Sequence, residues 1–269
     1  AVVPVVLFHA GFSLFSGGYV GVDVFFVISG YLITTILLSE LHAGKFSIVK
    51  FYERRARRLL PALFLVMACC LPFAWLWLLP EDMVDFGQSL MSVVGFVSNL
   101  LFWREETGYF NTAAELKPLL HTWSLAVEEQ FYLLFPLALM LLWKLPRLGL
   151  FALLALVSVI SLGIAEWGAH NQQAAAWFLL PTRAWELGIG ALAAMHLRSK
   201  PLDPQAGGGF NQLMSLAGIG MIAWAIFFFD DNTPFPGVWG LLPVVGTALV
   251  ILFATPATLG GKLLGTRVL

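Results

Sequence analysis

The chain has 269 residues, of which 59% are hydrophobic and only 12% are charged, and its formal net charge is −1. Soluble domains carry about 25% charged residues, so this composition excludes a soluble globular protein. Successive apolar stretches long enough to cross a bilayer predict an all-α, polytopic transmembrane helical bundle, whereas a β-barrel would show short alternating segments. We expect contacts with membrane lipids and no nucleic-acid partner.

In chain order, about eight or nine apolar segments alternate with linkers that hold proline, glycine and charged residues. The segments cover 1–16, 19–40, 58–79, 86–103, 119–143, 147–167, 175–197, 210–229 and 238–254. The chain starts inside an apolar segment and stops at "GTRVL", so we expect a single membrane domain, 1–269, that is incomplete at both ends. The adjacent Cys69 and Cys70 are interpreted as packing residues, since neighbouring cysteines rarely form a disulfide.

The most basic linker is 41–58, where six lysines and arginines stand against one acid, Glu53. The positive-inside rule places such a linker in the cytoplasm. It also places there Lys144, Arg147, Arg198, Lys200, Lys262 and Arg267. The turns "EWGAHNQQ" and "DDNTPFPG" contain no Lys or Arg and are expected on the outer side.

This alternation requires segment 86–103 not to cross the membrane once. Its polar residues make it a weak span and favour a re-entrant or outer-side segment; they are Gln88, Ser89, Ser92, Ser98 and Asn99.

Several polar side chains fall at one depth, near the outer ends of the predicted helices. His9 ends the first segment, Asp23 begins the second, and Arg183 and Glu186 are i, i+3 neighbours. On a helix that begins near Pro118, one face carries His121, Leu125, Glu128 and Tyr132. Ionisable groups at membrane depth usually line a cavity or pathway, because they cost about 2.5–3.5 kcal/mol to insert.

Simpler interpretations remain open for each of these groups. A lone histidine at a helix end is often only an interfacial residue. Arg183 and Glu186 can simply neutralise each other, and Glu128 and Glu129 cannot both face the bundle interior.

Four arginines in "YERRARRLLPAL" form two i, i+3 pairs, Arg54 with Arg57 and Arg55 with Arg58. Such pairs can hold phosphates bidentately. A topology signal, or attraction to anionic lipid headgroups, explains the same residues.

Taken together, the sequence blocks resemble a known family. These are "VVLFHAGF", "GGYVGVDVFFVISGYLI", "FYERRARRLLPAL", "SNLLFW…GYF", "ELKPLLHTWSLAVEEQFYLLFPLAL" and "PTRAWELGIGALAA". In this order they are similar to the bacterial type-3 membrane acyltransferases, which include O-antigen and other surface-polysaccharide O-acetyltransferases. The resemblance covers nearly the whole chain.

The resemblance implies transfer of an acetyl group from cytoplasmic acetyl-CoA to a hydroxyl of a carbohydrate outside the bacterial cytoplasmic (inner) membrane. It assigns catalysis to His9, with Asp23, His121 and Glu128 as further catalytic candidates. It places Ser29, Gly30, Arg54, Arg55, Arg57 and Arg58 on the acyl-CoA side. The acceptor side would hold Trp123, Glu129, Tyr132, Arg183 and Glu186, and no metal is expected.

A sugar hydroxyl is a poor nucleophile, so a neutral histidine suits the task of general base. We expect His9 to take this role, oriented by Asp23 or by a carboxylate of the 121–132 face. Direct transfer and an acyl-histidine relay are both open. The competing function class is a transporter or flippase, and the third is a membrane scaffold.

Overall fold

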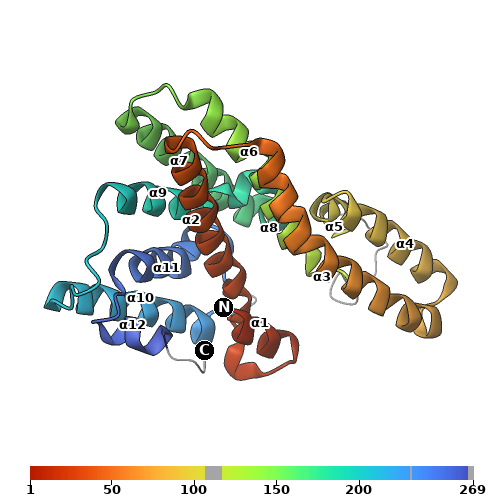
Figure 1. Ribbon diagram of the computed structural model, residues 1–269. Helices are drawn as coiled ribbons and strands as arrows, with labels where there is room; N and C mark the ends of the chain where they lie inside the picture. Colours follow the sequence, from red (N-terminus) through yellow and green to blue (C-terminus); the bar gives the residue numbers. More distant parts are fainter. Residues whose placement is uncertain (107–116, 231, 266–269) are drawn as a thin grey trace. The chain divides into compact units, whose positions relative to one another are not determined.

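The computed structural model describes residues 1–106, 117–230 and 232–265, and these residues form helices with no β-strand among them (Figure 1). The all-α prediction is therefore confirmed. The helices are α1 (Val2–His9), α2 (Gly21–His42), α3 (Ile48–Trp77), α4 (Pro80–Val94), α5 (Ser98–Glu106), α6 (Thr122–Leu142), α7 (Arg147–Asn171), α8 (Gln173–Phe178), α9 (Leu180–Ser199), α10 (Gly209–Phe228), α11 (Leu241–Phe253) and α12 (Leu259–Leu264). The "GYF" of 108–110 and Arg267 lie outside the described residues.

Five of these helical stretches are long and apolar enough to cross a membrane, which supports a multi-pass membrane protein. They are Gly18–His42, Ile48–Trp77, Thr122–Leu142, Arg147–Asn171 and Gly209–Phe228. Segment 86–103 is split between α4 and α5 by a turn at Gly95–Val97, and neither half has the length of a span. That break agrees with the prediction that this segment does not cross once.

Several predicted boundaries are wrong. The basic linker is helical from Ile48, because the Ser47 hydroxyl caps the backbone N–H of Lys50 and no helix breaker follows before Pro61. The four arginines therefore lie on α3. At its other end, α7 continues through the expected "EWGAHNQQ" turn as far as Asn171.

Two further segments differ from the prediction. Segment 175–197 is divided into α8 and α9, with a break at Leu179. The helix expected to begin near Pro118 begins at Thr122 instead, because the preceding residues form tight turns in which Leu119 O accepts from both the backbone and the hydroxyl of Thr122.

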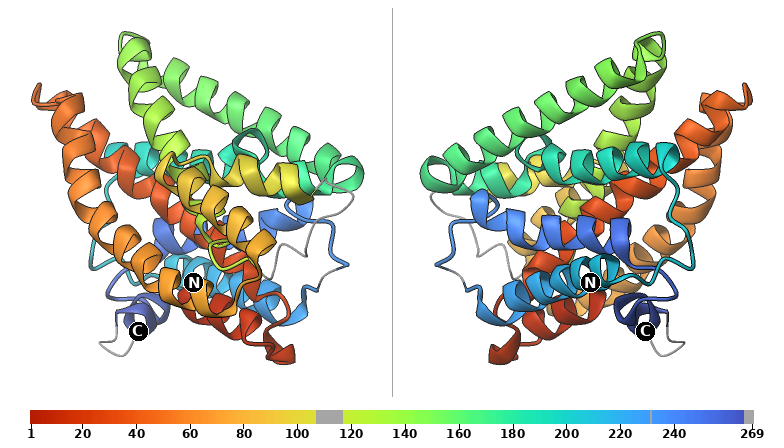
Figure 2. Two further views of the ribbon diagram at one scale, coloured as in Figure 1. Left: turned by 90° about the vertical axis from the view of Figure 1, so that its right-hand side faces the viewer. Right: turned by 90° about the vertical axis from the view of Figure 1, so that its left-hand side faces the viewer.

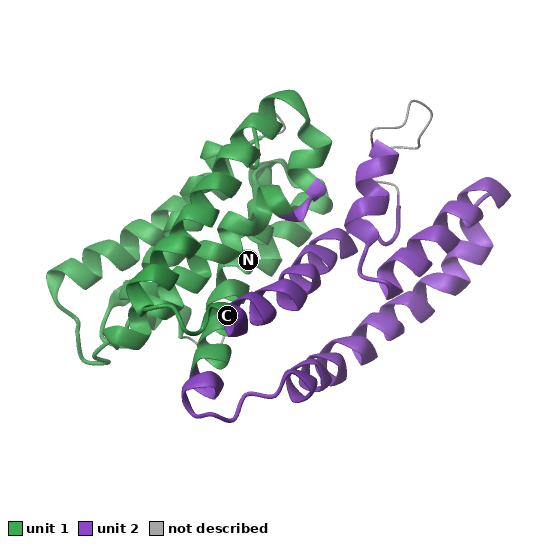
Figure 3. Cartoon of the chain, turned by 90° about the horizontal axis from the view of Figure 1, so that it is seen from above, with its two compact units in different colours: residues 1–38, 142–177, 181–269 green, residues 39–141, 178–180 purple. Residues whose placement is uncertain are grey.

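The chain divides into two compact units, coloured separately in Figure 3. Unit 1 comprises residues 1–38, 142–177 and 181–269, and unit 2 comprises residues 39–141 and 178–180. In unit 2, α3 lies beside α4, and a cluster that includes Leu63, Phe86 and Leu119 forms the core (Figure 1).

Unit 1 is held by close helix crossings at glycines. A Cβ on Gly30 of α2 would clash with the carbonyl oxygen of Leu187, and one on Gly190 of α9 would clash with that of Val27. Small residues let the two backbones touch, as in other membrane helix pairs. The neighbouring α10 and α11 run side by side (Figure 2).

Charges are separated between the two ends of unit 1. Glu166 accepts a hydrogen bond from Val238 N at 2.6 Å, and Tyr19 donates to Asp230 O at 3.3 Å. The two turns that lack Lys and Arg therefore share one end with the start of α2. At the other end, Arg147 donates to Met195 O, which joins the basic ends of α7 and α9. The two predicted outer turns therefore lie together, whereas the side of the membrane on which they lie stays a prediction.

Candidate active site

Unit 1 contains a polar cluster of three buried side chains, Asp23 of α2 with Arg183 and Glu186 of α9. We call it the buried triad. Arg183 Nη1 donates to Asp23 Oδ1 at 2.8 Å and to Glu186 Oε1 at 3.1 Å. No side chain of the three is more than 1% exposed. The predicted pairing of Arg183 with Glu186 is confirmed, and Asp23 joins it.

Aromatic rings enclose the guanidinium of the buried triad. Arg183 lies 5.0 Å from the ring centroid of Trp177 and 5.4 Å from that of Phe235, and its Nε donates to Trp177 O at 3.1 Å. Two carboxylates on one guanidinium carry one negative charge in excess when both are ionised. Asp23 Oδ2 and Glu186 Oε2 are also buried without a hydrogen-bond partner among the described residues. A charge set this desolvated persists only while all of its members are present.

His9 is the last residue of α1, and its side chain is exposed. Its Nδ1 lies 2.8 Å from Val5 O. A carbonyl oxygen can only accept, so Nδ1 must carry the proton in this bond. In the neutral ring Nε2 then has a free lone pair, which is the arrangement that a general base needs.

His9 and Asp23 have different partners. Val5 O orients the His9 ring, whereas the hydrogen-bond partner of Asp23 is Arg183. The expected orientation of His9 by Asp23 is therefore not formed here. Aromatic rings connect the two regions: Phe8 packs edge-on against Tyr19, and Tyr19 packs against Trp177.

In unit 2, Arg55 is engaged by two residues of α6. Its Nε and Nη2 donate to Glu129 Oε1 at 3.1 and 2.7 Å, and its guanidinium lies 3.6 Å from the ring centroid of Tyr132. Tyr52 donates to Leu133 O at 3.1 Å and so fixes the same crossing of α3 and α6. A phosphate at Arg55 would have to compete with Glu129 for Nε and Nη2 or bind through the remaining N–H groups.

The other three arginines form an exposed face of α3, here called the arginine face: Arg54, Arg57 and Arg58, at i, i+3 and i+4. Arg54 pairs with Glu40 at 2.6 Å and Arg57 with Glu53 at 2.8 Å, both at the surface. In the described part of the chain Arg58 has no ion pair. The predicted pairing of Arg55 with Arg58 on one face is replaced by this grouping.

Residues 1–260 match a family model described as an acyltransferase domain. The chain belongs to the type-3 acyltransferase family. It is 40% identical over 166 residues to the O-acetyltransferase OatA of Staphylococcus aureus (strain NCTC 8325 / PS 47), covering 61% of this chain and 27% of that protein. It is 31% identical over 277 residues to the peptidoglycan O-acetyltransferase OatA of Listeria monocytogenes (98% and 44% covered).

An uncharacterized protein of Haemophilus influenzae (strain Rd) is 34% identical over 239 residues, with 85% of this chain and 96% of that protein covered. The chain spans about a quarter of the length of the staphylococcal relative and under half of the listerial one. No solved structure matches it significantly.

The motif residues of this acyltransferase chain lie in both units. Ser29 is half-buried on α2, and Gly30 occupies the crossing with α9. On the α6 side, Trp123 is buried edge-on against Phe178, and Glu128 is half-buried.

His121 is exposed and precedes α6, so it does not continue the helical series to Glu128 and Tyr132. The predicted face is correct only from Leu125 onward.

Two polar side chains have contacts that were not predicted from the sequence, the buried Asn99 and the half-buried Gln130. Gln130 donates to Asn99 Oδ1 at 2.8 Å and to Phe96 O at 3.0 Å, while Asn99 donates to Phe178 O at 3.0 Å. Gln130 follows the two glutamates of the "EEQFY" block. Like them, it is a polar residue on an apolar helix, and this was a signal that its amide has hydrogen-bond partners. Among the described residues, no group of three His, Cys, Asp or Glu side chains could hold a metal ion.

Proposed function

We propose that the chain carries the membrane part of an O-acetyltransferase. The enzyme moves an acetyl group from cytoplasmic acetyl-CoA to a hydroxyl of a cell-surface glycan outside the bacterial cytoplasmic (inner) membrane. The observation that carries the proposal is the family match over residues 1–260 together with His9, whose Nδ1 bond leaves Nε2 available as a base. Relatives named as O-acetyltransferases, one of them for peptidoglycan, favour a glycan acceptor over a small molecule.

In the proposed reaction, His9 Nε2 takes the proton of the acceptor hydroxyl as its oxygen attacks the thioester carbonyl. The resulting tetrahedral intermediate collapses, the C–S bond breaks, and the CoA thiolate takes the proton from the imidazolium. Val5 O stabilises the imidazolium through Nδ1–H throughout, so the ring needs no reorientation. In the relay form of the reaction, Nε2 attacks the thioester carbonyl, the C–S bond breaks and CoA leaves as the thiolate. The acceptor hydroxyl then attacks the acetyl carbon, the N–C bond to His9 breaks, and the hydroxyl proton goes to the thiolate.

The donor side is the arginine face of α3. Its three arginines are at the surface, where Arg54 and Arg57 can exchange their carboxylate partners for the phosphates of CoA and Arg58 has no described ion pair to give up. Its basic charge places this end of α3 in the cytoplasm, where acetyl-CoA is found. Arg55 has a different role, which is to fix α3 against α6 through Glu129 and Tyr132.

The test uses membranes that contain the full-length protein, radiolabelled acetyl-CoA and a crude extract of surface glycans. We expect wild type to label the glycan and His9→Ala to lose at least about 100-fold of the rate, as for loss of a general base. His170→Ala is the matched control, because its Nδ1 also lies near the carbonyl oxygen four residues earlier, at 3.0 Å, at the same end of unit 1.

If wild type neither binds nor hydrolyses acetyl-CoA, the acyltransferase function is wrong and the transporter alternative takes its place. If His170→Ala loses as much activity as His9→Ala, the role of His9 as base is wrong. Labelled acetyl-CoA supplied without glycan separates the two reaction forms: label bound to the quenched protein supports the relay, and its absence supports direct transfer.

A further inference from the structure

Unit 2 contains a hollow of about 210 Å³ beside the first three turns of α4. Leu78, Phe86 and Pro118 form its apolar lining. Binding pockets for drug-sized molecules are about 300–1,000 Å³, so this hollow has room for a single small ring. None of the residues assigned above to acyl transfer lines it.

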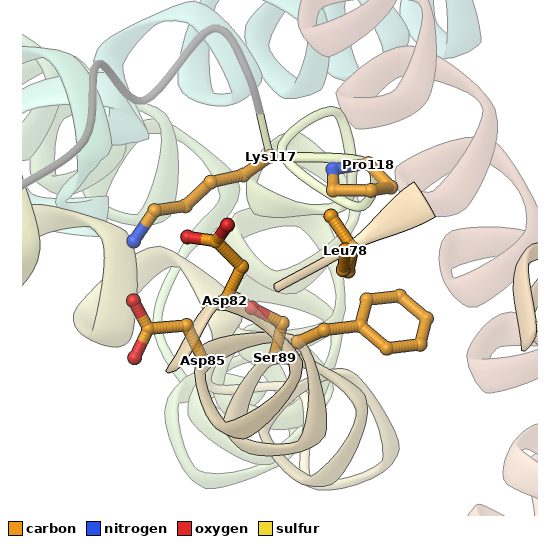
Figure 4. Close-up of a pocket in the computed structure, with 7 residues that line it drawn as sticks. Leu78, Asp82, Asp85, Ser89, Lys117 and Pro118 are labelled. Atoms are coloured by element: carbon orange, nitrogen blue, oxygen red, sulfur yellow. The ribbon is translucent and has the colours of Figure 1, made fainter. Parts of the chain in front are cut away.

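The polar lining comes mainly from one face of α4. Asp82, Asp85 and Ser89 are spaced i, i+3 and i+7, and Lys117 approaches from the start of the segment before α6. Figure 4 shows the two aspartates and Lys117 on one side of the hollow, with Leu78 and Pro118 on the other. The pocket therefore has a polar side and an apolar side.

Ser89 provides the observation that points to a ligand. Its residue is only 3% exposed, it lines the hollow, and its hydroxyl has no hydrogen bond to any described residue. The Ser89 oxygen is not among the fully buried atoms that lack a partner, so it is reachable from the hollow, and a ligand there would supply its hydrogen bond. The carboxylates of Asp82 and Asp85 likewise accept no hydrogen bond from the described part of the chain, whereas Lys117 is already paired with Glu105.

These groups select the chemistry of the ligand. Two unpaired carboxylates repel an anion, so phosphate and carboxylate ligands are excluded. A calcium ion is disfavoured because it takes six to eight oxygen ligands, and the described residues contain no group of three His, Cys, Asp or Glu side chains that could hold a metal ion. A ligand with several hydroxyl donors and one apolar face satisfies both sides of the pocket, and a pyranose ring has this construction.

The position along α3 agrees with such a ligand. The pocket lies just beyond Trp77, the last residue of α3, whereas the arginine face lies near the first. The 30 residues of α3 span about 45 Å, which is more than a bilayer core. With the arginines in the cytoplasm, the pocket opens on the outer side, where surface glycans are.

We propose that this pocket binds one neutral sugar ring of the acceptor glycan. Asp82 and Asp85 accept hydrogen bonds from its hydroxyls, Ser89 supplies the buried partner, and its C–H face packs on the apolar lining. The proposal deepens the proposed function and rests on it in one respect, namely that the acceptor is a glycan.

The test measures binding of a soluble N-acetylglucosamine tetramer to the full-length protein by calorimetry. Lipid nanodiscs replace maltoside detergent, because a maltoside headgroup is itself a sugar. We expect the double variant Asp82→Asn/Asp85→Asn to weaken binding at least about tenfold, since two charge-assisted hydrogen bonds are lost, and Ser89→Ala to weaken it severalfold.

Two matched controls lie on the same helix. Glu81→Gln removes a neighbouring carboxylate that is exposed and outside the pocket. Ser92→Ala removes a buried hydroxyl that already donates to Ser89 O at 2.8 Å. Both are expected to bind the tetramer as wild type does, and near-native thermal unfolding identifies variants that fold.

Three results would overturn the proposal: no binding by wild type, unchanged binding by both pocket variants, or spermidine binding that responds to these variants in place of the sugar.

Failure of this proposal can be distinguished from failure of the proposed function. Acetyl-CoA hydrolysis by the pocket variants reports on the donor half-reaction alone. Glycan acetylation without pocket-dependent sugar binding leaves the function standing and removes only this site.

Discussion

The buried triad of unit 1 and the arginine face of unit 2 use the same residue types in opposite ways. In the buried triad, one arginine and two carboxylates are at most 1% exposed. On the arginine face, the side chains of Arg54 and Arg57 are 51% and 80% exposed; Glu53, the partner of Arg57, is 51% exposed, and Glu40, the partner of Arg54, is 25% exposed. The first set is closed to any ligand, whereas the second can exchange its partners at little cost.

Because of this difference, the buried charged side chains have a structural role, whereas the exposed ones are available for a ligand. A buried ion pair contributes little net stability when complete, but removal of one partner leaves a desolvated charge. A surface pair contributes almost nothing to stability and is therefore free to serve a ligand. Burial, which the sequence does not show directly, decides between the two roles.

The largest effect on stability is expected when the arginine of the buried triad is removed. Arg183→Met keeps the length of the side chain but leaves Asp23 and Glu186 facing each other, and we expect a loss of about 3–5 kcal/mol in unfolding free energy. Glu186→Gln removes the excess negative charge and keeps a hydrogen-bond acceptor, so its loss should be much smaller. Thermal unfolding in nanodiscs measures both. Equal losses would show that the charge imbalance has no energetic consequence.

The second prediction concerns the close crossing of α2 with α9, which joins the two helices that carry the buried triad. In Gly30→Ala the new methyl group meets the carbonyl of Leu187, and we expect a loss of about 1–3 kcal/mol from overpacking. Gly163→Ala is the control, because a Cβ there meets nothing within 4 Å and alanine is the better helix former by up to about 1 kcal/mol. Opposite shifts in unfolding temperature are expected; a loss of the same size in both variants would contradict the crossing.

The sequence was sufficient for the fold class and for most helices, because hydrocarbon requires long apolar segments whatever the tertiary contacts. The predicted helix boundaries were wrong where another contact or cap outweighed the local sequence signal. The arginines of α3 suggested a linker, but the Ser47 cap and the absence of a breaker extend the helix over them. The break at Leu179 lies beside Phe178, whose carbonyl accepts from Asn99, a contact 79 residues away that no local pattern reveals.

The candidate site was predictable to the extent that its contacts are local. Arg183 and Glu186 are three residues apart, so their pairing followed from helical spacing. Asp23 is 160 residues from Arg183, and its place in the buried triad required the fold. The hydrogen bond of His9 to Val5 O spans four residues, so helical spacing alone is sufficient to predict it.

The smallest effect on stability, and the most direct test of the arginine face, comes from Arg57→Gln/Arg58→Gln. Both side chains are exposed, so no measurable change in unfolding temperature is expected. If the face holds the phosphates of CoA, the KM for acetyl-CoA should rise about tenfold at low salt, with kcat retained, and the difference should shrink as salt screens the exposed charges.

Arg55→Gln should behave in the opposite way, because its contacts with Glu129 and Tyr132 join α3 to α6: the unfolding temperature should fall, and the KM should change little. Lys200→Gln, which removes an exposed charge elsewhere, controls for net charge. A KM that rises only in Arg55→Gln would reverse the assignment and make the partly buried Arg55, in its pair with Glu129, the phosphate ligand.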